Sequence, residues 1–167
     1  MHLVLVVVKI SCIFDTSKAM KLEIKNFATM TKQILIGGQA LKELGSDRFT
    51  DDMDFLVFDS RNQDAFITGT KVDYLNAAST SFAGRFFNEI YKIEKGNEIA
   101  TPQSLLELKA FAFVQHCQNF NWKKVDSCEY DIKFLVREYG LKSVSIVKNY
   151  ISGSELSEVV KIISSVK

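Results

Sequence analysis

The sequence predicts an α+β fold: a small twisted mixed β-sheet flanked by helices, followed by a C-terminal all-helical lobe. Short apolar runs between turn residues fill residues 33–100, whereas apolar residues at helical spacing fill residues 101–167. The 167 residues are 47% hydrophobic and 25% charged with one proline, which indicates an ordered domain with a real core. We divide the chain into an apolar extension (1–19), a mixed core (20–100) and a helical lobe packed on that core (101–167).

The N-terminal extension is strongly apolar. Residues 3–14, LVLVVVKISCIF, are too few to span a bilayer, and Lys9 interrupts them. The segment also lacks the basic region and small-residue cleavage site of a signal peptide. It is either a buried or edge strand or a product of start-codon choice, with the natural protein starting at Met20. Together with three cysteines that form no CxxC pair, this favours a cytoplasmic protein with no membrane partner.

The first half of the core alternates helices with short strands. Residues 21–32 are amphipathic and predict a helix. Residues 33–36 form a brief apolar strand that ends at a Gly-Gly turn, and residues 39–44 predict a helix that stops at Gly45. The apolar run over residues 54–58 is typical of a strand covered on both faces.

The second half of the core contains further predicted strands. Residues 71–75, KVDYL, form a short one, and the alternation over residues 87–93 predicts another. Gly96-Asn97 then predicts a turn into an extended segment over residues 98–100.

The lobe begins with a clear helix start, because Thr101 can act as N-cap and Pro102 can occupy the first helical position. A second helix is predicted to begin near Asp126 or Ser127 and to end at Gly140. Two further helices are predicted over residues 141–151 and 155–166, the latter capped by Ser154. The apolar positions of the first two helices are Leu105, Leu108, Ala112, Phe113, Ile132, Leu135, Val136 and Tyr139.

Composition alone excludes little. The formal net charge of +1 gives no support to a broad nucleic-acid footprint, although it leaves room for a local basic groove. Cys117 beside His116 lacks the further ligands of a common zinc site, so we expect both residues to pack structurally.

One constellation carries most of the functional information. Asp52 and Asp54 are two residues apart at the start of a predicted strand, so their carboxylates point to the same face. Two neighbouring carboxylates repel each other unless a cation lies between them. The Gly37-Gly38 turn precedes them and allows the backbone to approach an anion. The pattern therefore predicts a metal–nucleotide site.

The spacing of this constellation resembles a known superfamily. A Gly-Gly turn followed by Arg48-x-Thr50-x-Asp52-x-Asp54 is similar to the signature of nucleotidyltransferases related to DNA polymerase β, in particular the minimal, AbiEii-like bacterial branch. Later matches follow in order over residues 33–135: Asp73 in KVDYL, Lys109 in SLLELKAF, and Asp131-Ile132.

The resemblance implies a metal-dependent enzyme that moves a nucleoside monophosphate from an NTP to an acceptor hydroxyl and releases pyrophosphate. The acceptor would be an RNA end, a protein or a small molecule, and a toxin-like role implies a possible antitoxin partner. Asp73 would also accept the proton of the attacking hydroxyl. The implied catalytic and metal ligands for Mg²⁺ or Mn²⁺ are Asp52, Asp54 and Asp73; the implied nucleotide-binding residues are Gly37, Gly38, Arg48, Thr50 and Lys109.

The sequence departs from the superfamily pattern at Gly38, where many members have a serine. Phosphate binding would then rest on backbone groups and on side chains such as Gln39 or Thr50. This departure keeps a second function open, namely a catalytically inactive nucleotide- or partner-binding protein on the same fold.

Several of these residues also have structural interpretations. Arg48 could pair with Asp47 or Asp51, and Lys109 could be an exposed lysine near Glu107. Asp131 is expected to be a structural residue at the lobe interface, and Asp51 a solvated neighbour of the site. Trp122, in NFNWKK, could mark a substrate surface, but an interhelical anchor is the preferred interpretation.

Overall fold

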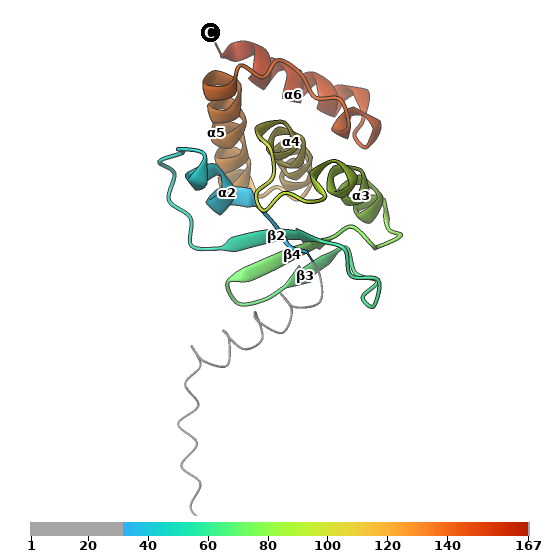
Figure 1. Ribbon diagram of the computed structural model, residues 1–167. Helices are drawn as coiled ribbons and strands as arrows, with labels where there is room; N and C mark the ends of the chain where they lie inside the picture. The colour runs from blue at the N-terminus through green and yellow to red at the C-terminus, as the bar shows by residue number, and fades with distance from the viewer. Residues whose placement is uncertain (1–31, 167) are drawn as a thin grey trace, which may run out of the picture. The chain divides into compact units, whose positions relative to one another are not determined.

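The computed structural model describes residues 32–166, which form one compact unit. This unit has an α+β fold, in which most of the helices follow a four-stranded mixed sheet (Figure 1). The strand considered for residues 3–14 and nearly all of the helix predicted over 21–32 lie outside the described residues. The elements are β1 (Ile34–Ile36), α2 (Gly37–Glu43), β2 (Met53–Val57), β3 (Phe66–Thr68), β4 (Val72–Asn76), α3 (Phe82–Glu94), α4 (Pro102–Gln118), α5 (Trp122–Tyr139), the 3₁₀ turn η1 (Val147–Asn149) and α6 (Gly153–Ser165).

The sheet has the strand order β1-β2-β4-β3. The central strands β2 and β4 are parallel, and each outer strand is antiparallel to its neighbour. Leu56 of β2 is fully buried in the core, so the sheet face that it shares with Asp54 is the face covered by helices. Figure 1 shows α2, α3 and α4 on that side of the sheet.

Helix α4 lies at the centre of the helical layer and packs against α2, α5 and η1. The sequence predicts apolar positions at helical spacing on this helix, but buried side chains occur on all of its faces. A helix surrounded by other elements must be apolar all round, which explains the difference. Its buried residues are Ser104, Leu105, Leu106, Glu107, Leu108, Ala110, Phe111, Phe113 and Val114.

Several predicted elements are confirmed. The strand–turn–helix from residue 33 to Gly45 is present as β1 and α2, and the next two predicted strands are β2 and β4. Thr101 caps α4 by accepting from the Ser104 N–H, with Pro102 in the first turn. Gly140 ends α5 with φ +63°. Residues 98–100 extend beside β1, because the Leu35 N–H donates to the Glu98 carbonyl and the Ala100 N–H to the Leu35 carbonyl.

The strand predicted over residues 87–93 is wrong, because these residues belong to helix α3. Their alternation competes with a helical period that begins earlier: Ala83, Phe86, Phe87 and Ile90 are all buried. Ser81 starts the helix by accepting the Gly84 N–H at 3.0 Å. The short strand β3, mostly exposed at the sheet edge, was not predicted.

The predicted helix over residues 141–151 is also wrong. Most of this segment is irregular, with only the short turn η1. The buried carboxylate of Glu107 accepts the backbone N–H groups of Ser145 (2.6 Å), Ile146 (3.2 Å) and Val147 (2.8 Å). A tertiary contact thus takes the donors that a helix would use internally.

Two helix starts also differ from prediction. Helix α5 begins at Trp122, one turn before Asp126, and its early residues Val125 and Cys128 are buried. Helix α6 begins at Gly153, and its N-cap is Ser152 in a capping box with Glu155, not Ser154. Among the described residues, no helix combines the length and hydrophobicity that a membrane crossing needs.

Candidate functional site

The turn from β1 into α2 lies directly against the Asp54 side chain. Gly37 has φ +68°, and a Cβ atom placed on it would lie 1.8 Å from Asp54 Oδ2. A Cβ on Gly38 would lie 2.8 Å from Thr50 Oγ1 and 2.9 Å from Arg48 Nη2. Both positions therefore require glycine, because neighbouring side chains lie too close to the backbone to leave room for a Cβ atom. The structure thus brings together five residues that the sequence predicts to share a site: Gly37, Gly38, Arg48, Thr50 and Asp54.

Asp54 and Asp73 are the only charged residues in the four described strands. They are register partners on the parallel strands β2 and β4, so they lie side by side at the spacing of neighbouring strands, about 4.8 Å. Both are half-buried, and Asp73 Oδ1 is buried without a hydrogen-bond partner. A charged pair at the centre of an otherwise uncharged sheet is costly for folding, which points to a functional reason for it.

The electrostatics of Asp54 are consistent with this crowding. Burial raises the pKa of its carboxyl above the usual value, the Asp73 and Asp52 carboxylates raise it further, and Lys109 and Lys124 oppose the rise. The local field at this end of the sheet thus favours an added positive charge.

The donor set fits a hard cation, because it consists of carboxylate oxygens and one of them lacks any protein donor. Asp54 and Asp73 are the residues that would hold such an ion. Asp52 is exposed and close enough to influence Asp54, but within residues 32–166 no group of three His, Cys, Asp or Glu side chains is gathered to hold a metal.

Arg48 and Lys109 meet at one buried carboxylate, that of Asp131. Arg48 donates from Nε to Asp131 Oδ1 at 2.7 Å and from Nη2 to Oδ2 at 3.1 Å. Lys109 Nζ lies 2.7 Å from Asp131 Oδ2, and only 1% of the Asp131 side chain is exposed. The structural role expected for Asp131 is confirmed. Pairing of Arg48 with Asp47 or Asp51 is not observed, nor is pairing of Lys109 with Glu107.

The loop over residues 44–52 lies along α5. Tyr139 donates to the Leu44 carbonyl at 2.8 Å, and Tyr130 donates to Asp47 Oδ1 at 2.6 Å. Gln39, considered for phosphate binding, instead donates from Nε2 to the Thr50 carbonyl at 3.0 Å. Together with Arg48–Asp131, these contacts fix the loop that leads into β2.

Sequence reasoning missed Lys124 as a site residue. It lies in the first turn of α5 and is close enough to lower the pKa values of both Asp54 and His116. Burial is the largest cause of the lowered pKa of His116. The interpretation of Trp122 as an interhelical anchor is wrong, because 60% of its surface is exposed. The only sequence signal for both residues was the NFNWKK segment between two helices.

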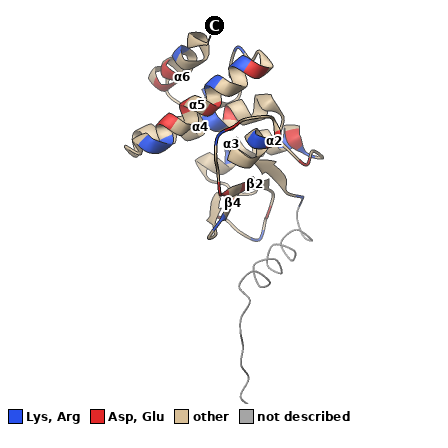
Figure 2. Ribbon diagram, turned by 90° about the vertical axis from the view of Figure 1, so that its left-hand side faces the viewer, with Lys and Arg blue, Asp and Glu red and all other residues tan. Residues whose placement is uncertain are grey.

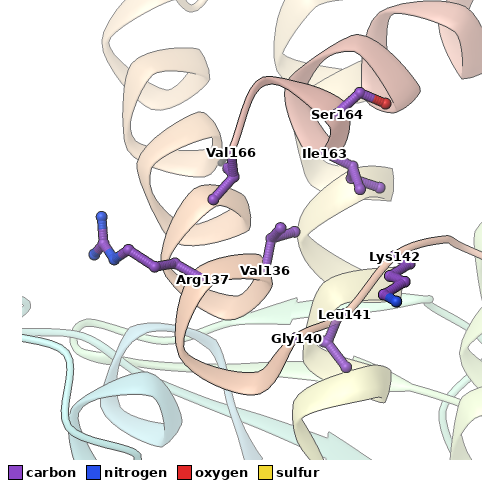
Figure 3. A pocket seen from close by; sticks show the side chains of 8 residues that line it. All are labelled: Val136, Arg137, Gly140, Leu141, Lys142, Ile163, Ser164 and Val166. Atoms are coloured by element: carbon purple, nitrogen blue, oxygen red, sulfur yellow. The ribbon is translucent and has the colours of Figure 1, made fainter.

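Charged residues elsewhere lie mainly on helices and loops, as Figure 2 shows. A cavity of about 380 Å³ separates the C-terminal ends of α5 and α6. Val136, Ile163 and Val166 point into it, whereas Arg137 extends away (Figure 3). None of the predicted site residues lines this cavity, so the carboxylate pair remains the candidate site.

The sequence matches no protein-family model and no curated protein. Its function is therefore inferred from the geometry of these side chains.

The raised pKa of Asp54 predicts a pH dependence of stability in the metal-free protein. The folded state binds this proton more tightly than the unfolded chain, so the contribution of Asp54 to the free energy of unfolding falls as pH rises from about 3.8 through the raised pKa. We expect Asp54→Asn to remove this loss, so that its stability relative to wild type increases with pH.

Urea unfolding of both proteins in EDTA between pH 4 and 7 measures this difference. Carboxylates that do not interact with Asp54 cancel in the subtraction. A difference that stays constant with pH would contradict the prediction.

Proposed function

We propose that this protein is a metal-dependent nucleotidyltransferase that moves a nucleoside monophosphate from an NTP to an acceptor hydroxyl. The observation that carries the proposal is the Asp54–Asp73 pair, which supplies the only charged residues of the strands within residues 32–166 and lies beside a Gly-Gly turn that opens a helix. This arrangement juxtaposes carboxylates for a cation with backbone N–H groups for phosphates.

Each residue has a role that its position supports. Asp54 and Asp73 would hold Mg²⁺ or Mn²⁺, with Asp52 joining them from its exposed position. The cation, when bound, would neutralise charge on the triphosphate and lower the pKa of the attacking hydroxyl. Asp73, which has an oxygen without a protein partner, would also accept the hydroxyl proton.

Phosphate contacts would come from the Gly37-Gly38 backbone and from the neighbouring cations. Arg48 and Lys109 together carry two positive charges against the single negative charge of Asp131. A guanidinium has five N–H donors and an ammonium has three, so both side chains keep donors beyond those given to Asp131. Asp131 would then act by holding two phosphate-binding side chains in place.

The test is label transfer. We would incubate the protein with Mg²⁺ or Mn²⁺, each α-labelled NTP in turn, and cellular RNA, protein and small-molecule fractions. Wild type is expected to label one fraction. Asp54→Asn and Asp73→Asn are expected to reduce the rate at least 100-fold, because loss of metal-mediated stabilisation costs several kcal/mol.

Asp51→Asn is the matched control. This carboxylate is exposed and three residues from Asp54, and the proposal gives it no role, so its transfer rate should stay within about twofold of wild type. Equal losses in Asp51→Asn and Asp54→Asn would show that the effect is not specific to the carboxylate pair.

A catalytically inactive nucleotide- or partner-binding protein is the second candidate. It is favoured by one observation, namely that Arg48 and Lys109 are already engaged by Asp131. Metal-dependent stabilisation by NTP, lost in Asp54→Asn and unaccompanied by transfer in any fraction, would select this function.

A further inference from the structure

The turn between α4 and α5 exposes two aromatic side chains. Phe120 is 76% exposed and Trp122 is 60% exposed. Their ring centroids are 6.2 Å apart and their planes are inclined by 69°. The two rings therefore present differently oriented faces to solvent, where they gain nothing from burial in the core.

Phe120 is also unfavourable for the backbone. It has φ +54° and is the one non-glycine residue with positive φ among those described. It follows the C-cap Asn119 of α4, the position where glycine is usual because this conformation crowds a Cβ atom. The backbone bonds that end α4 run from the Phe120 N–H to the Cys117 carbonyl and from the Asn121 N–H to the His116 carbonyl, so they need no side chain at position 120. An exposed aromatic side chain on this strained residue therefore points to a role at the surface.

Lysines adjoin the two rings. Lys123 and Lys124 are exposed and follow Trp122 in the first turn of α5, which contains no acidic residue. Asn119 and Asn121 complete the turn, and the nearest acidic residue along the chain is Asp126. Aromatic faces beside lysines on a positive helix end suit bases joined by phosphates.

The turn is oriented toward the candidate site. The loop over residues 44–52 is hydrogen-bonded to α5 at two places. Leu44 is bonded to Tyr139 near the C-terminal end of α5, whereas Asp47 and Arg48 are bonded to Tyr130 and Asp131 near its middle. The loop therefore runs antiparallel to the helix. Continuing this course brings the first turns of α5 toward the Asp52–Asp54 end of the loop. The influence of Lys124 on Asp54 agrees with that placement.

We propose that Phe120, Trp122, Lys123 and Lys124, the aromatic–lysine patch, bind a short single-stranded nucleic acid and present its end to the Asp54–Asp73 pair. The idea that this nucleic acid is the acceptor of the nucleoside monophosphate rests on the proposed function. Its binding to the patch does not. Two rings and two lysines fit two or three nucleotides, which is compatible with the small net charge of +1. Lysine is depleted in protein–protein interfaces, which disfavours a protein partner here.

Trp122 is the single tryptophan of the chain, so its fluorescence reports on the patch directly. We would titrate the protein, without metal or NTP, with ten-nucleotide single-stranded RNA and with single-stranded DNA of the same sequence. Stacking is expected to quench the fluorescence. The logarithm of the binding constant should fall with the logarithm of salt concentration with a slope of about −1.4, for two lysine–phosphate contacts. The RNA and DNA arms distinguish the two chemical sources.

Phe120→Gly is the decisive variant. It should weaken binding roughly 5- to 100-fold through the loss of one stacked base. It should also raise the melting temperature by about 2–4 °C, because glycine accepts the φ of this position, so the loss cannot come from unfolding. Replacing Lys123 and Lys124 by alanine should flatten the salt dependence. The same change at Lys142 and Lys148, exposed lysines between α5 and α6, should leave it unchanged.

Quenching by single strands that is lost in Phe120→Gly supports the inference, even if no nucleotide transfer is ever found. Wild-type affinity in Phe120→Gly overturns it. So does quenching by anionic vesicles or by blunt duplex but not by single strands, or no quenching at all. Label transfer to a protein or small molecule without strand binding would overturn the inference and leave the proposed function standing.

Discussion

Asp131→Ala is expected to lower the free energy of unfolding by about 3–5 kcal/mol, because it removes the shared counterion of two largely buried cations. Only 26% of the Arg48 side chain and 13% of the Lys109 side chain are exposed, so water cannot replace the lost carboxylate well. The residue also joins parts of the chain far apart in sequence, since Arg48 and Asp131 are 83 positions apart. Urea unfolding at pH 7 measures the change.

Asp47→Ala is the matched control for this prediction. Asp47 is also bound by α5, through Tyr130, but the contact is exposed. Its loss should therefore cost less than about 1 kcal/mol. Replacing Arg48 and Lys109 by methionine in the Asp131→Ala background should restore part of the stability, because no unpaired charge then remains. If Asp131→Ala and Asp47→Ala cost the same, the buried cluster does not have the energetic role assigned here.

Gly37→Ala is expected to have the second large effect, a loss of about 2–5 kcal/mol. The left-handed backbone costs an L-residue about 1–2 kcal/mol. The new methyl group would also overlap Asp54 Oδ2, 1.8 Å away, and such overpacking typically costs about 1–3 kcal/mol. The overlap can be relieved only if the Asp54 carboxylate moves. The rate of label transfer should therefore fall as well as the free energy of unfolding.

Gly140→Ala separates the two causes. Gly140 has φ +63°, close to the +68° of Gly37, but a Cβ atom there meets nothing within 4 Å. Its loss of stability should be the backbone cost alone, about 1–2 kcal/mol, with transfer activity kept. If Gly37→Ala and Gly140→Ala lose equal stability, the Asp54 side chain can move away from the new methyl group at no cost. The turn would then not hold this carboxylate in position.

Local chemistry made much of the site predictable. The Gly-Gly turn, the two-residue spacing of Asp52 and Asp54, and the apolar strands are short-range patterns, and they locate β1, α2, β2 and β4. Capping is equally local, so Thr101 with Pro102 marked the start of α4 correctly. The resemblance also singled out Asp73, and the parallel pairing of β2 and β4 places it beside Asp54.

Other features depend on partners distant in sequence. Residues 87–93 alternate like a strand, but burial against the core selects the helical period of α3. Residues 141–151 have a helical composition, but the Glu107 carboxylate captures their backbone donors.

The sequence by itself therefore determined the succession β1, α2, β2 and the later strand β4, together with the residues gathered at the β1–α2 turn, because local spacing dictates them. Only the tertiary structure decided that Arg48 and Lys109 share Asp131, that Asp73 Oδ1 has no protein donor, and that Phe120 and Trp122 face solvent. Each of these depends on which distant groups compete for the same hydrogen bonds or the same buried space, and no local pattern encodes that competition.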